Sequence, residues 1–314
     1  MHTVTLARHA MATRFELVLH GDDPVALRAA GEAALREIDR LEDQLSLYRP
    51  GSEIAQLNAR AAREAVRVTP EVFALLQHAR QLHAETGGAF DITIAPLVRC
   101  WGFLGAGGRM PAAGEIAVAR ALVGMEQVQL NAANSTVRFA RDGVMLDLGA
   151  IGKGYAVGQA AEVLREAGVG SALIHGGTST VYAIGHPPDA EAWRIAIEPP
   201  PGIGRDATPH LPAAVPLRDA ALSVSAVWGR AFTENGKMFG HVLDPRRGEP
   251  VSRALLAVVV LPSATETDAL STALLTLGAD GHEGISALRP AMRTLLLTPT
   301  ADGFRTVARG IDRL

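Results

Sequence analysis

The chain has 314 residues and a formal net charge of -3, from 30 Lys and Arg against 33 Asp and Glu. Hydrophobic residues make up 48% of the sequence and charged residues 20%. This composition excludes a disordered chain, and the near-balanced charge argues against a nucleic-acid partner, because such proteins usually carry a strongly basic face. A chain of this length can bury one large core or two smaller ones.

The sequence also argues against a membrane span and against thiolate chemistry. The longest apolar run, Ala254 to Leu261, has the length of a strand and falls short of the roughly 18 residues of a membrane-spanning helix. A single cysteine, Cys100, leaves no intrachain disulfide and no thiolate zinc site, and we interpret it as a buried small side chain. The N-terminal segment lacks the charged start and apolar stretch of a signal peptide, which predicts a cytoplasmic location, or a periplasmic one if the sequence is a mature form.

The N-terminal part predicts a strand or bent hairpin followed by helices. Val4 to Leu19 alternates apolar and polar residues, as strands do. Asp23-Pro24 supplies the N-cap and first-turn residues of a helix. Ser52 and Thr69-Pro70 begin two further helices, the second of which ends at Gly87-Gly88. One apolar stripe follows the first helix, at Leu27, Ala34, Ile38, Leu41 and Leu45.

The rest of the chain mixes strands and helices without strict alternation, which predicts an α+β (mixed α/β) fold and not a doubly wound sheet. Helices are predicted from Gly152 to Ala167 and, after the capping-box pair Ser263 and Glu266, as far as Gly278. The Pro-rich stretch from Pro199 to Pro216 is predicted to be a surface excursion or a lid. Strands are predicted at 144–148, 172–175, 181–184, 193–197, 221–225, 254–261, 294–297 and 304–307, with hairpins over 127–140 and 238–243.

Several common catalytic motifs are absent from the sequence. Gly149 to Gly154 lacks the spacing and the terminal Ser or Thr of a Walker A loop. The sequence contains no G-x-S-x-G elbow and no H-E-x-x-H motif. Its 10 His residues are scattered, so a metal site has to be built from oxygen ligands and backbone groups.

The segment from Asp147 to Lys153 is a candidate phosphate site. An acidic residue ends a predicted strand, and a glycine-rich turn leads into a predicted helix. Small residues let a ligand approach the backbone, a helix N-terminus favours phosphate, and Lys153 adds a positive charge. The alternative is an ordinary strand–helix turn with a solvated lysine.

A candidate metal site lies on the predicted helix that ends at Gly278. Asp268, Ser271 and Thr272 occupy positions i, i+3 and i+4, so their oxygens share one helix face. A carboxylate with hydroxyls suits Mg²⁺, which prefers oxygen ligands. The alternative is that both hydroxyls bond to carbonyls of their own helix.

Two further segments are candidates for catalysis and ligand binding. His241 and Asp244, in a strand that turns through Gly248, can exchange protons near a site. The alternative is a turn in which Asp244 bonds its own backbone and His241 is structural. Thr86 to Thr93 can cradle a planar ligand or be a helix end followed by core.

Six segments, in this order, resemble the FAD:protein FMN transferase (ApbE) family. They are Met11 to Thr13, Tyr48 to Ile54, Thr86 to Val98, Asp147 to Val157, His241 to Val251 and Thr267 to Gly278. The resemblance implies a two-lobed single domain over residues 1–314, with an FAD cleft between the lobes. It also implies a Mg²⁺-dependent transferase that splits FAD at its pyrophosphate, releases AMP and attaches FMN through its phosphate to a Ser or Thr hydroxyl of an acceptor protein.

The resemblance also implies roles for single residues. His241 is expected to accept the proton of the attacking hydroxyl. Mg²⁺ is expected to bind the Ala150 carbonyl, Asp268, Ser271 and Thr272. Contacts with FAD are expected from Met11, Tyr48, Ala89, Phe90, Asp91, Asp147, Lys153 and Leu243.

Two segments depart from the family pattern. Thr178 follows Gly176-Gly177, where the family usually has Asp or Asn, and Ser225 to Trp228 replaces Ser-Gly-x-Tyr. Neither change removes an expected metal ligand. The alternative functions are a Mg²⁺-dependent FAD hydrolase that yields FMN and AMP, and a non-catalytic flavin-binding protein.

Overall fold

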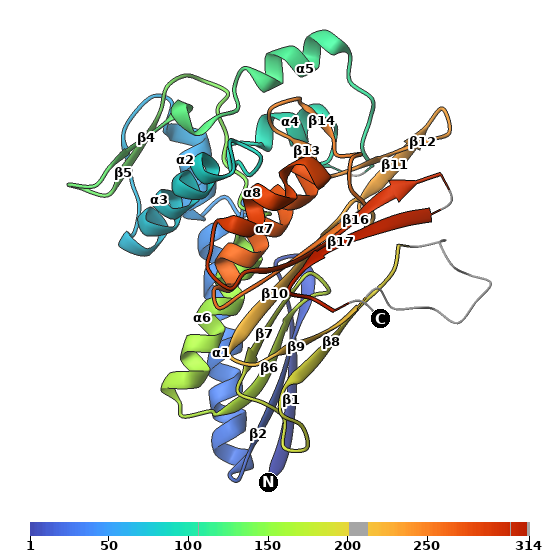
Figure 1. The fold of residues 1–314 in the computed structure, drawn as a ribbon. Coiled ribbons are helices and arrows are strands. Elements are labelled where there is room, and N and C mark those ends of the chain that lie inside the picture. The colour runs from blue at the N-terminus through green and yellow to red at the C-terminus, as the bar shows by residue number, and fades with distance from the viewer. Residues whose placement is uncertain (106, 201–212, 302, 313–314) are drawn as a thin grey trace.

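The centre of the fold is an antiparallel sheet. The computed structural model describes residues 1–105, 107–200, 213–301 and 303–312, and within them eight strands pair in the order β1-β2-β6-β7-β10-β15-β16-β17. Both edge strands come from the ends of the chain, and the middle strands come from its second half (Figure 1). The strands are β1 (His2–Ala10), β2 (Thr13–Gly21), β6 (Ser171–Gly176), β7 (Thr180–Ile184), β10 (Ala220–Ala226), β15 (Leu256–Leu261), β16 (Arg293–Thr300) and β17 (Gly303–Arg309).

Helices α1 (Pro24–Leu45), α6 (Gly152–Glu166) and α7 (Ala264–Leu277) lie on one face of the sheet, with α6 in contact with both α1 and α7 (Figure 1). The predicted caps are confirmed, because Asp23 accepts hydrogen bonds at the start of α1 and Ser263 accepts one at the start of α7. The predicted apolar stripe of α1 is buried along its whole length.

The opposite face of the sheet packs against a two-stranded sheet of β8 (Trp193–Ile197) and β9 (Ala213–Leu217). Val215 and Leu217 lie in one buried cluster with Leu173 and Val258 of the large sheet. The central strand β15 is therefore covered on both faces, and all six of its residues are buried. This is why its sequence is continuously apolar and does not alternate.

The remaining elements lie mainly beyond one end of the sheet (Figure 1). The helices are α2 (Glu53–Arg60), α3 (Pro70–Glu85), α4 (Ala95–Cys100), α5 (Ala113–Arg120) and α8 (His282–Ala287), with 3-10 turns at Met125–Gln127 and Gly278–Gly281. The strands are β3 (Val66–Arg67), β4 (Val128–Asn131), β5 (Thr136–Phe139), β11 (Ala231–Glu234), β12 (Lys237–Gly240), β13 (Leu243–Asp244) and β14 (Glu249–Pro250).

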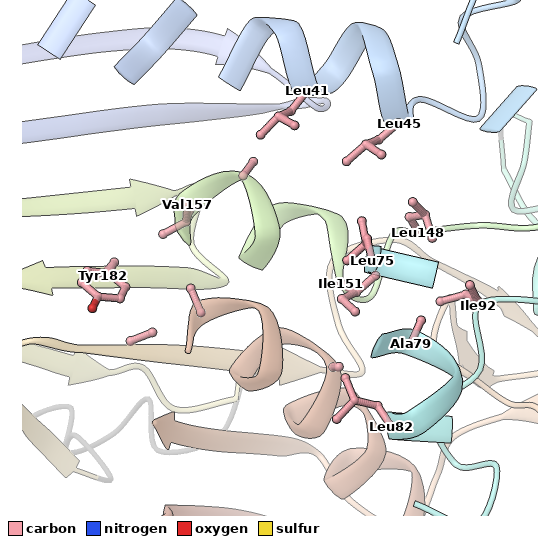
Figure 2. Close-up of a cluster of buried hydrophobic side chains, with 14 of the residues drawn as sticks. Leu41, Leu45, Leu75, Ala79, Leu82, Ile92, Leu148, Ile151, Val157 and Tyr182 are labelled. Carbon is pink, nitrogen blue, oxygen red and sulfur yellow. The ribbon is translucent and has the colours of Figure 1, made fainter. Parts of the chain in front are cut away.

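One hydrophobic cluster connects these elements to the sheet and its helices. Figure 2 shows Leu148 and Ile151 near α1 on one side and near α3 on the other, and both side chains are buried. Gly149 and Ala150, between them, remain at least partly exposed. Burial of Leu148 and Ile151 therefore fixes the turn that leads into α6 and holds its two middle residues outward.

The predicted α+β class is confirmed, and so is the burial of Cys100, whose thiol pKa is raised by that burial. The predicted strand at 144–148 is wrong. Leu146 exchanges two hydrogen bonds, of 2.7 and 2.9 Å, with the side chain of Asn58. Asp147 N donates to the Ile92 carbonyl at 2.7 Å. A side-chain amide and a loop carbonyl thus replace the partner strand.

The hairpin predicted over 238–243 is also misplaced. The observed hairpin of β11 and β12 turns at Asn235 and Gly236, which have φ values of 53° and 74°. Positive φ at both central residues is the requirement of a type I′ turn, and Asn-Gly meets it best. The sequence carried this signal two residues before the predicted start.

The Pro-rich excursion predicted over 199–216 is partly wrong. Residues 201–212 lie outside the described residues, but 213–216 belong to β9. Ala213 and Val215 alternate inward and are fully buried, whereas Pro216 faces outward. Among the described residues, no helix has both the length and the apolar character needed to cross a membrane.

A charged network ties α3 to α7. Arg289 donates to Glu85 at 2.7 Å and to Glu266 at 2.8 Å, and His78 Nε2 lies 3.3 Å from Glu266 Oε1. The hydrogen bond from His78 and the charged bonds from Arg289 lower the pKa of Glu266 to about 2.

We predict that Glu266→Gln lowers the free energy of unfolding by about 1–3 kcal/mol at neutral pH, because Arg289 loses a charged partner. The folded-state pKa of Glu266 lies below its usual 4.5, so this stabilisation is present above pH 4.5 and is lost as the pH falls toward 2. Denaturant unfolding at a series of pH values measures the difference. The control is Glu64→Gln, in an exposed pair with Arg60, which should cost less than about 0.5 kcal/mol. Equal losses in both variants contradict the prediction.

Candidate functional site

Segments that are far apart in the sequence meet at the N-terminal end of α6. The turn at 147–151 leads into the helix, and α7 crosses it. The end of β10 packs against α7 on its other side. Residues 230 and 241 complete the group, because the charges of Lys153 and Arg230 act on both Asp147 and His241.

The crossing of α6 and α7 is close because Gly154 has no side chain. Its N–H donates to Asp268 Oδ2 at 2.9 Å. A Cβ atom on Gly154 would lie 2.2 Å from the Ala264 carbonyl oxygen and 2.7 Å from Asp268 Cβ. The N-terminus of α6 therefore reaches the carboxylate of a residue that is only 4% exposed.

The oxygens around Asp268 match the donors that a hard cation prefers. Within the described part of the chain, no donor contacts Asp268 Oδ1, although Oδ2 is bound by Gly154 N. Ser271 and Thr272 donate to the Asp268 carbonyl at 3.0 and 3.2 Å, as in the alternative interpretation of this helix. Both hydroxyls also contact Ser225 Oγ, at 2.9 and 3.1 Å.

No three His, Cys, Asp or Glu side chains gather as a metal site in the described ranges. The candidate donor set is therefore one carboxylate with hydroxyls, together with the Ala150 carbonyl of the turn that leads into α6. Such a set fits Mg²⁺, which binds few protein ligands and keeps several waters.

Asp147 and Lys153 both bond to the turn that leads into α6. Asp147 Oδ1 accepts from Gly149 N at 2.8 Å, and Lys153 Nζ donates to the Gly149 carbonyl at 3.1 Å. Burial raises the pKa of Asp147, while the Gly149 bond and the charges of Lys153 and Arg230 oppose the rise. The residue is nevertheless partly exposed, so solvent still reaches it.

His241 is held by the carbonyl of Arg230. The backbone N–H of His241 and its ring Nδ1 contact that oxygen at 3.0 and 3.1 Å. A carbonyl only accepts, so Nδ1 carries the proton and Nε2 of the neutral ring carries the lone pair, to which no residue in the described ranges donates. Burial lowers the pKa of His241, and the charges of Arg230 and Lys153 lower it further against the opposing bond to the carbonyl.

Arg230 and Ser225 are site residues that the sequence interpretation missed. Arg230 also donates through Nη2 to the carbonyls of Phe103 and Gly105, at 2.5 and 3.3 Å, so it ties a glycine-rich loop to the strand end beside His241. Ser225 opens the segment 225–228 that departs from the family pattern, and Arg230 lies two residues beyond that segment. An Arg next to Gly229 was the available signal, but only the fold shows which charges it faces.

Asp244 forms its own turn. Its carboxylate accepts from Arg246 Nε at 2.9 Å and Nη2 at 2.8 Å, and its carbonyl accepts from Gly248 N at 2.7 Å. Trp101 Nε1 donates to the Gly248 carbonyl at 2.8 Å and anchors the far end of the turn. Among the described residues no hydrogen bond joins Asp244 to His241.

The segment around Asp91 is buried. Ala89 and Phe90 are each 1% exposed, and Asp91 is 7% exposed. Asp91 Oδ1 accepts from the backbone and hydroxyl of Thr93, at 2.7 and 2.6 Å. Asp91 Oδ2 lies 3.2 Å from His83 Nδ1, too poorly aligned for a hydrogen bond, and the carboxylate raises the pKa of His83. The carboxylate therefore points into the protein.

The other expected FAD contacts lie in different surroundings. Met11 is in the tight turn between β1 and β2, with φ 48°, and this turn lies against Gly177, where a Cβ would be 2.3 Å from Thr13 Oγ1. The turn that contains Thr178 is thus beside the Met11 turn. Tyr48 is 64% exposed, and Leu243 is buried in the cluster that contains Trp101.

A cavity of about 510 Å³ lies at the other end of α6. Its lining includes His20, Asp22, Val169 and His186. The α6 helix has 15 residues and is therefore about 22 Å long, so this cavity is separate from the group around Asp147 and His241.

The comparisons with known proteins cover nearly the whole chain. The model of the ApbE family matches residues 11–295. The FAD:protein FMN transferase of Haemophilus influenzae is 30% identical over 314 residues, which cover 96% of this chain and 88% of that protein. The crystal structure of the ApbE protein from Thermotoga maritima superimposes with a TM-score of 0.86 at 26% identity, over 99% and 97% of the two chains. The apo form of the Pseudomonas stutzeri flavinyl transferase ApbE gives a TM-score of 0.83 at 30% identity, over 98% and 95%.

We predict that Gly154→Ala lowers the free energy of unfolding by about 1–3 kcal/mol, because the new methyl group must push α6 away from the Ala264 carbonyl. The matched control is Gly158→Ala, one turn along the same helix, where the nearest atoms to a Cβ are 3.9 Å away. That variant should gain about 0.5–1 kcal/mol from helix propensity. Chemical denaturation measures both, and a stable Gly154→Ala protein would refute the tight crossing.

Proposed function

Because the chain belongs to the ApbE family, we propose that it is an FAD:protein FMN transferase. It cleaves FAD at the pyrophosphate, attaches FMN through its phosphate to a Ser or Thr hydroxyl of an acceptor protein, and releases AMP. The observation that carries this proposal is a neutral histidine, His241, on which the charges of Lys153 and Arg230 act, while Gly154, the residue after Lys153, donates to the Asp268 carboxylate. The names of the relatives support the same activity.

The charges suit an anionic substrate. Phosphoryl transfer depends mainly on positioning and on neutralising charge around phosphorus. Lys153 and Arg230 supply two positive charges beside Gly149 and Ala150, which are at least partly exposed and so let a phosphate approach the backbone. Mg²⁺ held by Asp268, Ser271, Thr272 and the Ala150 carbonyl would supply further charge neutralisation at the pyrophosphate.

His241 performs the proton transfer in this proposal. Its Nε2 accepts the proton of the acceptor hydroxyl, whose oxygen bonds to the FMN phosphorus. The bond from that phosphorus to the bridging oxygen breaks, and the electron pair leaves with AMP. Asp244 acts as a positioning residue, because its turn follows His241 directly and is closed by Arg246.

We assign the kind of contact that each residue makes with FAD from how exposed that residue is. Met11, Tyr48, Asp147 and Lys153 are at least partly exposed and can meet FAD through their side chains. Ala89, Phe90 and Leu243 are buried, so we assign backbone contacts to them. Asp91 shapes this segment through Thr93.

We predict that the purified protein with FAD, Mg²⁺ and an extract of its source cell forms a flavin-labelled protein band and releases AMP in equal amount. Asp268→Asn should slow both by about 10²-fold or more, because the proposed cation site loses its carboxylate. The control Asp142→Asn, which neutralises an exposed carboxylate outside the proposed cation site, should change neither. Flavin fluorescence after denaturing electrophoresis and chromatography of AMP measure the products. Free FMN and AMP without any labelled protein would favour the FAD hydrolase, and no turnover of FAD would favour a non-catalytic flavin binder.

We predict that the rate of AMP release rises with pH along a limb whose midpoint lies below 6.5. The reason is that His241 must be neutral to accept a proton, and its pKa is lowered from 6.5. Replacement His241→Gln should reduce the rate by about 10²–10⁴-fold without abolishing FAD binding. A midpoint above neutral pH, or loss of FAD binding together with the rate, contradicts this role.

A further inference from the structure

A seam of hydroxyl groups joins β10 to α7. Alternate residues of a strand repeat every 6.6–6.8 Å, roughly, and residues four apart on a helix repeat every 6 Å, about one turn. Ser223 and Ser225 on β10 therefore match Thr267 and Ser271 on α7. The contacts are 2.8 Å for Ser223 with Thr267 and 2.9 Å for Ser225 with Ser271.

The three hydroxyls at Ser223, Thr180 and Thr267 have one proton for each of their three contacts. Thr267 Oγ1 donates to the Ala264 carbonyl at 2.9 Å. Ser223 then donates to Thr267, and Thr180 donates to Ser223 at 3.1 Å. All of these side chains are fully buried. Each of the three contacts therefore holds one proton, and this end of the seam is a complete hydrogen-bond chain.

The three hydroxyls of Ser225, Ser271 and Thr272 have one proton fewer than they have contacts. Ser271 and Thr272 each contact the Asp268 carbonyl, and each also contacts Ser225 Oγ. These described residues make four oxygen–oxygen contacts but have only three hydroxyl protons. At most three of the four contacts can be ordinary two-centre hydrogen bonds, and the fourth has to share a proton or leave two lone pairs facing each other. Unlike the Ser223 group, Ser225 and Thr272 are partly exposed.

A cation bound by these oxygens would account for a contact that has no proton of its own. Two oxygens that bind one metal ion lie close together without a proton between them. In a Mg²⁺ octahedron with bonds of 2.0–2.1 Å, neighbouring ligands are about 2.9 Å apart. Ser225 Oγ and Thr272 Oγ1 are 3.1 Å apart, on the same side of α7 as the Asp268 carbonyl.

Building on the proposed function, we propose that Ser225 is an additional hydroxyl ligand of the divalent-cation site formed by Asp268 and Thr272. The residue comes from β10 and so ties the cation to the central sheet as well as to α7. Ser225 keeps the Ser of the family's Ser-Gly-x-Tyr segment, whereas the neighbouring positions depart from it.

The test is titration of Mn²⁺, a hard cation that substitutes for Mg²⁺, followed by the electron paramagnetic resonance signal of the free ion. Each protein is titrated with Mn²⁺ alone and with Mn²⁺ plus FAD. Ser225→Ala should weaken Mn²⁺ binding by about 10-fold or more. Ser225→Thr restores a hydroxyl on a residue that suits a strand, and it should stay within about threefold of wild type.

The matched control is Ser223→Ala, which removes a hydroxyl from the same seam but from its balanced end, and it should leave Mn²⁺ affinity unchanged. If Ser225→Ala does not fold, Ser225→Cys keeps the size and replaces oxygen by a softer donor, with the same expected loss. Equal Mn²⁺ affinity in wild type and the Ser225 variants overturns this inference and leaves the proposed function standing. No Mn²⁺ binding to wild type in either arm overturns the cation requirement of the proposed function as well.

Discussion

The contact between Gly154 and Asp268 is the constraint on which the rest of the site depends. It brings the N-terminus of α6 onto a nearly buried carboxylate of α7, at 2.9 Å, and it requires a residue without a side chain. The turn at 147–151, which leads into α6, has a second anchor, because Leu148 and Ile151 are fixed in the hydrophobic core (Figure 2). Backbone between two such anchors has little freedom, so the turn can present its carbonyls and N–H groups without much ordering cost on binding.

Electrostatics then divides the site into parts with different tasks. The charges of Lys153 and Arg230 oppose the rise that burial causes in the pKa of Asp147, and they lower the pKa of His241, which favours its neutral form. In the proposed function, the same two charges that favour the neutral histidine would also attract a pyrophosphate, so one arrangement would serve both binding and proton transfer. The oxygen-rich group on α7 and β10 is the part of the site that we propose binds a cation.

Features that depend on neighbours in the sequence were predictable. The caps at Asp23, Ser52, Thr69 and Ser263 all form, because a cap is a hydrogen bond between residues two or three apart. The Asn235-Gly236 turn was equally local and could have been found. The strand expected at 144–148 failed for the opposite reason, since Asn58, 88 residues from Leu146, supplies the hydrogen bonds that a strand would have taken.

For the site, residue types and their order were enough to indicate the family, and they gave the candidate oxygen ligands and the candidate base, because these depend on side-chain chemistry. The packing of distant elements decided how those groups are arranged. It placed the Arg230 carbonyl against His241 Nδ1, turned the Asp91 carboxylate inward and brought Ser225 to Thr272 across 47 residues. Such contacts depend on strand register and on the close approach of two helices, and neither is encoded in any single segment of the chain.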